Sequence, residues 1–201
     1  MSIARRYRRA SMALAVLMVG TVSVVNAQAA KAQGKAKGAP AHFRLTTPDL
    51  VSKGRIAVSH VFNGMGCNGQ NQSPALEWAN PPAGTKSFAV TMYDPDAPTG
   101  SGWWHWVMYN IPASTTGLVA GAGNGRNPPG GSAQGRTDFG SKGYGGPCPP
   151  VGDKPHHYHI TVFALKVDKL DVPGDATAAY VGFNLNANKL ATARVTGLYG
   201  R

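Results

Sequence analysis

The sequence predicts a mainly β fold, a β-sandwich that carries a small amount of helix. Its 201 residues include 26 glycines and 15 prolines, and the apolar runs between these turn-forming residues are short. This pattern favours antiparallel strands over a bundle of helices. Residues 87–93 also alternate, with Phe88, Val90 and Met92 on one face and smaller side chains on the other, as in a strand with one buried face.

The positions of the strands follow from the apolar runs and from the residues that bound them. We expect strands, in chain order, over residues 43–45, 56–61, 87–93, 106–111 and 158–165. The last of these has the clearest pattern, because β-branched and aromatic residues occupy it throughout. Pro112 would close the fourth strand, since proline cannot donate to a sheet ladder.

Two short helices are expected near the end of the chain, over residues 176–181 and 185–195. The apolar residues of the second segment would lie on roughly one side of a helix, and Gly197 would end it. Residues 117–142 are rich in glycine and long for a connection. Connections of that length are often functional.

The first 27 residues have the layout of a secretory signal peptide. Four arginines within residues 5–9 precede an apolar run of 13 residues at positions 13–25, and Val25-Asn26-Ala27 offers a cleavage site. An uncleaved membrane anchor is the alternative, but a run this short would span a bilayer poorly. We therefore expect a periplasmic or secreted protein.

Residues 28–41 are rich in Ala, Lys and Gly and hold few side chains that could bury apolar area, so they predict a flexible tail. The folded domain would then cover residues 42–201. This length suffices for a single well-buried core.

The formal charge of +11 overstates the charge of that domain. The four arginines of the signal segment and three lysines of the tail account for seven of the 20 basic residues. Thirteen basic residues then stand against nine acidic ones, a net charge of +4. A charge of that size without a basic helix or stripe does not require nucleic acid, and we expect none as a partner.

Cys67 and Cys148 are the two cysteines of the chain. In an exported protein they are free to oxidise, and one disulfide is the simplest prediction. A disulfide between residues 67 and 148 would close a long loop and stabilise the fold by roughly 4–5 kcal/mol, less any strain in the native state. Two buried thiols, or a reactive Cys148 in its proline-rich loop, are the alternatives.

The pattern richest in candidate site residues is DPDAP at residues 94–98, followed by WWHW at residues 103–106. Asp and Pro mark a rigid turn, and three indoles together mark a dense apolar patch. His105, with acids nearby, is therefore a candidate polar group of a binding pocket. A turn packed on the core, with one hydrogen-bonded histidine, is the alternative.

A second segment strengthens the pocket hypothesis. The loop GYGGPCPP at residues 143–150 leads into HHYHITVFAL at residues 156–165. Together with the first pattern, it resembles the two signature regions of the phosphatidylethanolamine-binding protein family, which includes Raf kinase inhibitor protein. The resemblance is to the bacterial branch and extends over most of residues 42–200. It implies an antiparallel Greek-key β-sandwich with short C-terminal helices.

Alternation along an extended strand predicts which side chains share a face. His105 would share a face with Trp103, while the other two tryptophans would take the opposite face. His156 and Tyr158 would share a face of the second segment. The expected inward set is Asp94 or Asp96, His105, His156 and Tyr158.

The family resemblance assigns roles to these positions. It implies a ligand cavity lined by Asp94, His105, His156 and Tyr158. Its walls would come from Pro98 and from the proline-rich loop around Cys148. Asp96 would support the loop as much as it binds the ligand.

Such a cavity suits a small anion or a zwitterionic phosphate ester. Histidine and the Tyr158 hydroxyl can donate to phosphate oxygens, and glycine-rich backbone can present N–H groups as an anion nest. A carboxylate beside an anion could pair with a histidine and keep it charged, or it could receive a ligand ammonium group. The sequence leaves both roles open.

This chain also departs from the eukaryotic pattern of the family. Eukaryotic members usually carry two adjacent histidines where this chain has Trp104 and His105, and an arginine where it has His157. These differences imply a cavity that is more apolar and less charged.

We therefore expect a non-enzymatic binding protein without a cofactor, which holds a small anionic ligand such as a phosphate ester or a phospholipid headgroup. The alternative is a protein-interaction module that inhibits a protease or kinase or binds another protein, with residues 117–142 as its contact surface. A hydrolase that uses His105 and the acid pair is a third hypothesis.

Other chemistries have weaker support in the sequence. No GxSxG, HExxH, paired CxxC or P-loop motif is present. His156, His157 and His159 are zinc-ligand types, but neighbours on a strand point in opposite directions, so we expect no metal. A Cys148 nucleophile beside His156 would require a free thiol.

Overall fold

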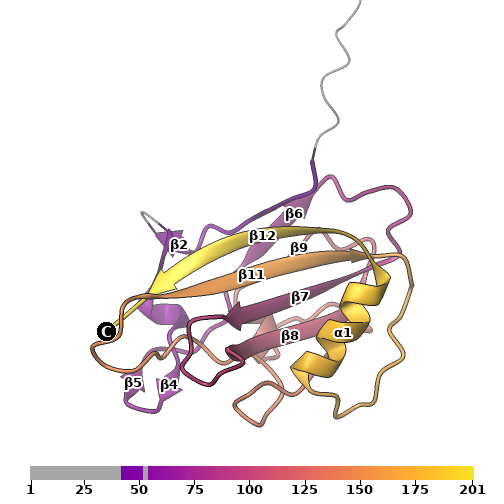
Figure 1. Ribbon diagram of the computed structural model, residues 1–201. Coiled ribbons are helices and arrows are strands. Elements are labelled where there is room, and N and C mark those ends of the chain that lie inside the picture. Colours follow the sequence, from indigo (N-terminus) through magenta and orange to yellow (C-terminus); the bar gives the residue numbers. More distant parts are fainter. Residues whose placement is uncertain (1–41, 52–53) are drawn as a thin grey trace, which may run out of the picture. The chain divides into compact units, whose positions relative to one another are not determined.

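The computed structural model describes residues 42–51 and 54–201, and the predicted signal peptide and tail lie outside this part. Strands dominate the described part (Figure 1). They are β1 (Arg44–Thr46), β2 (Leu50–Val51), β3 (Arg55–Ile56), β4 (Asn63–Gly64), β5 (Cys67–Asn68), β6 (Leu76–Ala79), β7 (Ser87–Asp94), β8 (Trp103–Pro112), β9 (Gly117–Leu118), β10 (Ala133–Gln134), β11 (His156–Leu165) and β12 (Lys189–Tyr199). Helical segments are α1 (Ala178–Asn188) and the 3-10 turns η2 (Val58–His60) and η3 (Ala122–Asn124).

The described strands form two sheets and a hairpin. The main sheet has the order β10-β8-β7-β11-β12-β3-β2, and its pairs are antiparallel except for β12 with β3. A smaller sheet has the order β1-β6-β9, and β4 pairs with β5. The mainly β prediction is confirmed.

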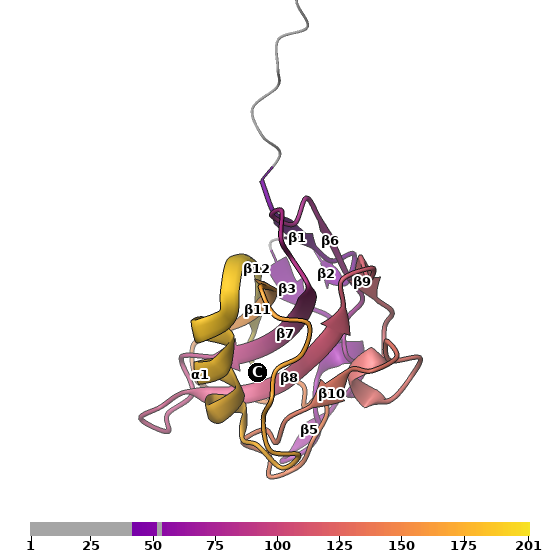
Figure 2. The same cartoon turned by 90° about the vertical axis from the view of Figure 1, so that its right-hand side faces the viewer.

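The main sheet is covered on both faces (Figure 2). On one face, Val181 and Leu185 of α1 pack with Val107 and Leu165 of the sheet. On the other, the small sheet contributes a cluster of buried apolar side chains that includes Trp78. Burial on both faces explains why β7 is buried along almost its whole length instead of on alternate residues only.

The strand predictions succeed where the pattern was strong. Residues 87–93 and 158–165 fall within β7 and β11, and the strand expected at 106–111 begins earlier, at Trp103. The strand expected over 56–61 is wrong. Ile56 ends the short strand β3, and the chain then forms η2, where the backbone N–H of His60 donates to the Ala57 carbonyl and the His60 side chain is buried.

The helix predicted over residues 185–195 is right for residues 185–188, which belong to α1, and wrong beyond Asn188. The helix α1 ends at Asn188, and β12 pairs antiparallel with β11 along its length. The unpaired backbone groups along β11 need a partner strand, and this requirement outweighs a weak helical pattern. Gly197 lies opposite Tyr158, where a Cβ would lie 2.6 Å from Ile56 Cγ1, so it permits close strand packing instead of ending a helix.

Residues 117–142 do not form an unstructured connection. They contain β9, η3 and β10, and Gly121 N–H donates to the Ser73 carbonyl. The Asn124 side chain accepts from Ser73 N–H at 2.8 Å. Much of this segment is therefore anchored to the fold, and its exposed part centres on residues 124–128.

Candidate ligand-binding site

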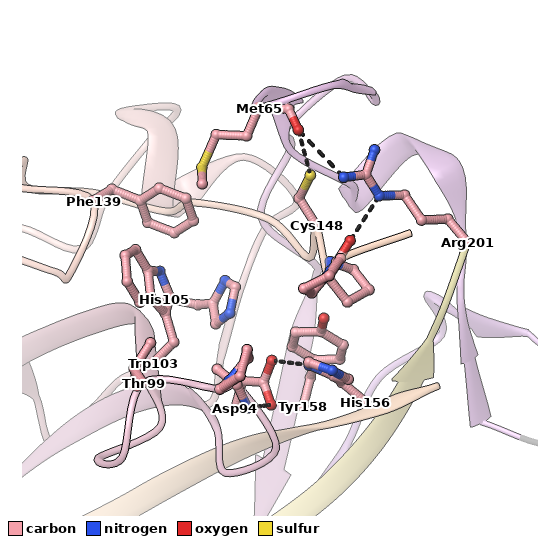
Figure 3. A pocket seen from close by; sticks show the side chains of 14 residues that line it. Met65, Asp94, Thr99, Trp103, His105, Phe139, Cys148, His156, Tyr158 and Arg201 are labelled. Carbon is pink, nitrogen blue, oxygen red and sulfur yellow. Dashed lines mark hydrogen bonds and ion pairs between the residues drawn. The ribbon is translucent and has the colours of Figure 1, made fainter. Parts of the chain in front are cut away.

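A cavity of about 280 Å³ opens at the end of the main sheet where β7 ends and β8 and β11 begin. Six of the seven predicted site residues line it: Asp94, Pro98, His105, Cys148, His156 and Tyr158. Figure 3 shows the polar groups converging from three strands. Asp96, the seventh, does not line the cavity.

A β-bulge in β8 aims His105 into this cavity. Met92 pairs with Trp106 and Tyr93 pairs with Trp104, which leaves His105 as the extra residue. An extra residue breaks the alternation of faces and re-aims a side chain. Trp106 therefore packs in the same core cluster as Tyr158, on the side that His105 faces. The prediction that Trp106 lies opposite His105 is wrong for this reason.

Asp94 organises the turn that follows β7. Its Oδ1 accepts hydrogen bonds from the backbone N–H of Asp96 at 2.8 Å and of Ala97 at 3.1 Å. Such a side-chain-to-backbone turn is typical of Asp before a proline-rich loop. Its Oδ2 lies 2.8 Å from His156 Nδ1, so the carboxylate pairs with a histidine as one of the two sequence hypotheses requires.

His156 lies between two carboxylates. Its Nδ1 faces Asp94, and its Nε2 lies 3.4 Å from Asp153 Oδ2. Burial lowers the pKa of His156, but the hydrogen bonds and charges of these carboxylates outweigh burial, so the net effect raises its pKa. This arrangement favours the imidazolium, which can donate from both nitrogens at once.

His105 has the opposite environment. Its Nδ1 lies 2.7 Å from the Gly145 carbonyl oxygen, and its ring is almost fully buried beside Tyr158 and Phe139. Burial lowers the pKa of His105 to about 4, although the Gly145 carbonyl and the Asp94 charge act in the other direction. The ring is therefore neutral near pH 7.

Tyr158 is fully buried, and its hydroxyl has no hydrogen-bond partner among the described residues. Burial raises the pKa of Tyr158, and the nearby Asp94 charge raises it further, so the phenol keeps its proton. A buried hydroxyl without a partner is costly, and native proteins seldom retain one without a reason.

Asp96 lies outside the cavity lining and holds the turn after β7 against His157. Its Oδ2 accepts from both the backbone N–H and Nδ1 of His157, each at 2.7 Å. The backbone hydrogen bond from His157 is the main cause that lowers the pKa of Asp96. This pair connects the turn after β7 to the start of β11, which is the loop-supporting part of the role predicted for Asp96.

The loop that carries Cys148 forms the opposite wall. Cys67 and Cys148 form the predicted disulfide, which removes the thiol that a cysteine nucleophile would need. Gly145 N–H donates to the His105 carbonyl, and Gly146 N–H donates to Asn71 Oδ1. These two glycine amides are thus occupied within the protein and do not form the anion nest considered from the sequence.

Several lining residues were not among the predicted site residues. Met65 holds a positive φ of 53° in the β4–β5 turn and lies over the cavity together with Phe139. Arg201 donates to the carbonyls of Pro149 and Gly66, and Figure 3 shows its further contact with the Met65 carbonyl. These hydrogen bonds join the loop around Cys148 to the β4–β5 turn. The contacts with Pro149 and Gly66 join residues 52 and 135 positions apart, so no local pattern could reveal them.

Residues 42–51 and 54–201 contain no group of three or more His, Cys, Asp or Glu side chains placed to hold a metal ion. They also contain no helix that is both long and apolar enough to cross a membrane.

Comparison with known proteins identifies similar chains. The family model described as phosphatidylethanolamine-binding protein matches residues 46–200. UPF0098 protein YbcL of Escherichia coli is 55% identical over 161 residues, which cover 79% of this chain and 88% of YbcL. UPF0098 protein YbhB of the same organism is 51% identical over 158 residues, covering 78% of this chain and 99% of YbhB.

A more distant relative and two solved structures extend the comparison. A Mycobacterium tuberculosis protein named as the lipoprotein LppC is 35% identical over 66% of this chain and 62% of its own length. The crystal structure of E. coli YbcL is described as a new member of the mammalian PEBP (phosphatidylethanolamine-binding protein) family. It matches with a TM-score of 0.77 and 54% identity, covering 80% of this chain and 99% of that chain. A PEBP homologue from Chlamydia trachomatis matches with TM-score 0.67 and 27% identity over 81% and 99%.

Proposed function

The chain belongs to the phosphatidylethanolamine-binding protein family, and from this premise we propose that it is a non-enzymatic binding protein for a small anionic ligand. The ligand would be a phosphate ester or a phospholipid headgroup. It would occupy the cavity between the ends of β7, β8 and β11.

The observation that carries this proposal is the Tyr158 hydroxyl. It is a fully buried donor without a partner among the described residues, and it lies in a cavity that also receives His105 and Asp94. A phosphate oxygen would accept from this hydroxyl and remove the cost of leaving it unpaired. The apolar walls would strengthen that hydrogen bond by excluding water.

Binding without turnover is favoured by the state of the candidate nucleophiles. Cys148 is held in the disulfide, and the Thr99 hydroxyl donates to the Gly102 carbonyl at 2.5 Å. Nucleophilic catalysis needs a side chain beside a base that can take its proton. Neither group has that arrangement.

An extracytoplasmic location is part of the proposal. The Cys67–Cys148 disulfide suits an oxidising compartment such as the periplasm, and the residues 1–27 have the pattern of a signal peptide. The similar M. tuberculosis protein named as a lipoprotein agrees with this location.

Isothermal titration calorimetry with phenyl phosphate tests the proposal on the mature protein. We expect one binding event per chain, and Tyr158→Phe should weaken it about tenfold, the effect of one lost hydrogen bond. Tyr180→Phe is the matched control, because Tyr180 is half exposed on α1 and does not line the cavity. Its affinity should equal that of the wild type.

Two results would count against the proposal. If Tyr158→Phe binds phenyl phosphate as well as the wild type does, the ligand does not contact this hydroxyl. If the wild type binds neither phenyl phosphate nor phosphorylethanolamine, the protein-interaction hypothesis becomes the better explanation. That hypothesis would then be tested by deletion within the exposed residues 124–128.

A further inference from the structure

The hydrogen-bonding capacity of Asp94 is largely committed within the protein. Its Oδ1 accepts two backbone N–H groups and its Oδ2 accepts from His156. A carboxylate has about four lone-pair positions, so at most one remains for a ligand. Asp94 therefore acts mainly as a buried negative charge at the edge of the cavity.

The ring nitrogens of His156 are also occupied by partners within the protein. Both of its ring nitrogens face carboxylates, Nδ1 that of Asp94 and Nε2 that of Asp153. As an imidazolium it has two N–H groups, and both are directed at these partners. His156 thus compensates the Asp94 charge without offering its own N–H to a ligand.

His105 presents an acceptor to the cavity. The Gly145 carbonyl can only accept, so the 2.7 Å contact requires that Nδ1 of His105 carries the proton. A neutral imidazole has one N–H, which leaves a lone pair on Nε2. Burial holds the pKa of this ring at about 4, so the same tautomer persists near neutral pH.

Tyr158 presents a donor beside this acceptor. Its hydroxyl is unpaired within the described part of the chain, and its ring lies 5.1 Å from the His105 ring in an edge-on arrangement. The cavity therefore offers one O–H donor and one nitrogen acceptor from adjacent rings. A ligand that satisfies both must bring an acceptor and a donor of its own.

We propose that the site selects an anion that carries its own hydrogen-bond donor, namely a phosphate monoester in its monoprotonated form. The P–OH group donates to Nε2 of His105, and an unprotonated phosphate oxygen accepts from the Tyr158 hydroxyl. This inference rests on the proposed function, since it specifies the ligand of that same cavity. A dianion or a phosphodiester would leave Nε2 of His105 facing another acceptor.

The surrounding charges favour the same choice. The titratable and charged groups that face His105 or line its cavity are Asp94, Asp138, His156, Tyr158 and Arg201. Asp94 and His156 compensate each other, and Arg201 is turned toward loop carbonyls. One ligand charge is then easier to accommodate than two, because like charges repel strongly at low dielectric.

A matched pair of ligands tests the proposal by calorimetry. Phenyl phosphate at about pH 5 is largely a monoanion with a P–OH group, since the second pKa of such esters is about 6. Phenyl methyl phosphate carries the same single charge but has no donor. We expect the monoester to bind at least about tenfold more tightly, because the diester leaves His105 unsatisfied.

The pH dependence of the binding affinity shows whether the titrating group belongs to the ligand or to the protein. The affinity for phenyl phosphate should fall about tenfold per pH unit above the ligand's second pKa. A fluorinated aryl phosphonate with a lower second pKa should move this midpoint to lower pH. A midpoint that stays in place for both ligands would assign the titration to the protein, for example to His156, and overturn the proposal.

Nitrogen-15 NMR of the histidine rings supplies a readout without ligand. A protonated Nδ1 and an unprotonated Nε2 on His105 between about pH 5 and pH 8 are required, and a protonated Nε2 would overturn the proposal. Equal binding of diester and monoester would overturn it as well, while leaving the proposed function intact. Binding of neither ligand would overturn the proposed function, and this inference with it.

Discussion

His105 and His156 lie in one cavity, yet their surroundings shift their pKa values in opposite directions. His156 has a carboxylate at each nitrogen, and its pKa is raised although the residue is buried. His105 has a backbone carbonyl at Nδ1 and aromatic rings around it, and its pKa falls to about 4. Residue type alone therefore does not define the role of a histidine, because the partners of its nitrogens decide which form it takes.

The buried His105 should make the fold sensitive to acid. Its folded pKa is about 4 and its unfolded pKa about 6.5, so between these values the unfolded state binds more protons. Stability then falls as the pH drops from about 6.5 to about 4, by about 3 kcal/mol in total. Urea denaturation at several pH values should show that His105→Gln loses less stability in this window than the wild type.

An exposed histidine supplies the control for this effect. His42→Gln should show the same acid response as the wild type, because His42 is exposed to solvent. If His105→Gln and the wild type lose equal stability between about pH 6.5 and pH 4, then other groups carry the acid response.

Among the elements, the bulge in β8 has the greatest consequence for the site. Without the extra residue, Trp103 and His105 would alternate regularly with Trp104 and Trp106. With it, Trp104 packs toward α1 while Trp106 enters the opposite core cluster. One inserted residue thus sets the direction of the His105 ring and places the Trp106 indole in the core cluster that also holds Tyr158.

Gly146 of the proline-rich loop packs directly against the backbone of residues 60–62. A Cβ on Gly146 would overlap the His60 carbonyl oxygen and lie 2.6 Å from Phe62 N. Because backbone atoms cannot move aside as a flexible side chain can, Gly146→Ala should destabilise the fold by about 1–3 kcal/mol. Urea denaturation monitored by tryptophan fluorescence would measure this loss.

Gly174 offers a matched substitution, since a Cβ there meets no atom within 4 Å. Gly174→Ala should be neutral, or stabilising by less than about 1 kcal/mol, because alanine restricts the unfolded chain. If Gly146→Ala and Gly174→Ala both unfold at the same urea concentration as the wild type, the loop can shift away from residues 60–62 without a loss of stability.

At the scale of the whole molecule, the cavity is assembled from distant parts of the chain. Its floor comes from β7, β8 and β11, while its outer wall comes from the β4–β5 turn and the loop around Cys148. The disulfide and Arg201 join these two wall segments. The wall therefore depends on covalent and polar cross-links more than on regular secondary structure.

Loss of the disulfide should weaken both the fold and the site. Cys67 and Cys148 are 81 positions apart, and closing such a loop is worth roughly 4–5 kcal/mol in the chain-entropy model. The Cys67→Ser/Cys148→Ser variant should lose about 2–5 kcal/mol of stability in urea denaturation. It should also bind phenyl phosphate more weakly, because Cys148 lines the cavity.

Denaturation of the wild type with and without a reducing agent provides the control. Reduction should lower the wild-type midpoint to that of the double-serine variant and leave the variant unchanged. Equal midpoints for the oxidised and reduced wild type would show that the cross-link contributes little to stability.

Sequence patterns alone predict the mainly β fold, the long strands β7 and β11, the disulfide partners and six of the 14 residues that line the cavity. These succeed because alternation, β-branched residues and turn formers act locally, and because six site residues fall in two short segments. The strand β12 was missed because its identity depends on the unpaired edge of β11, a partner distant in the sequence.

How those residues act depends on contacts that form only in the folded protein. The bulge reverses the expected side of Trp106, and Asp94 pairs with His156 while Asp96 pairs with His157 at the rim. Met65 and Phe139 reach the cavity from loops and Arg201 from the segment after β12, and no sequence pattern connects these positions. Protonation and hydrogen-bond direction depend on atoms within a few ångströms, and such neighbours exist only once the chain has folded.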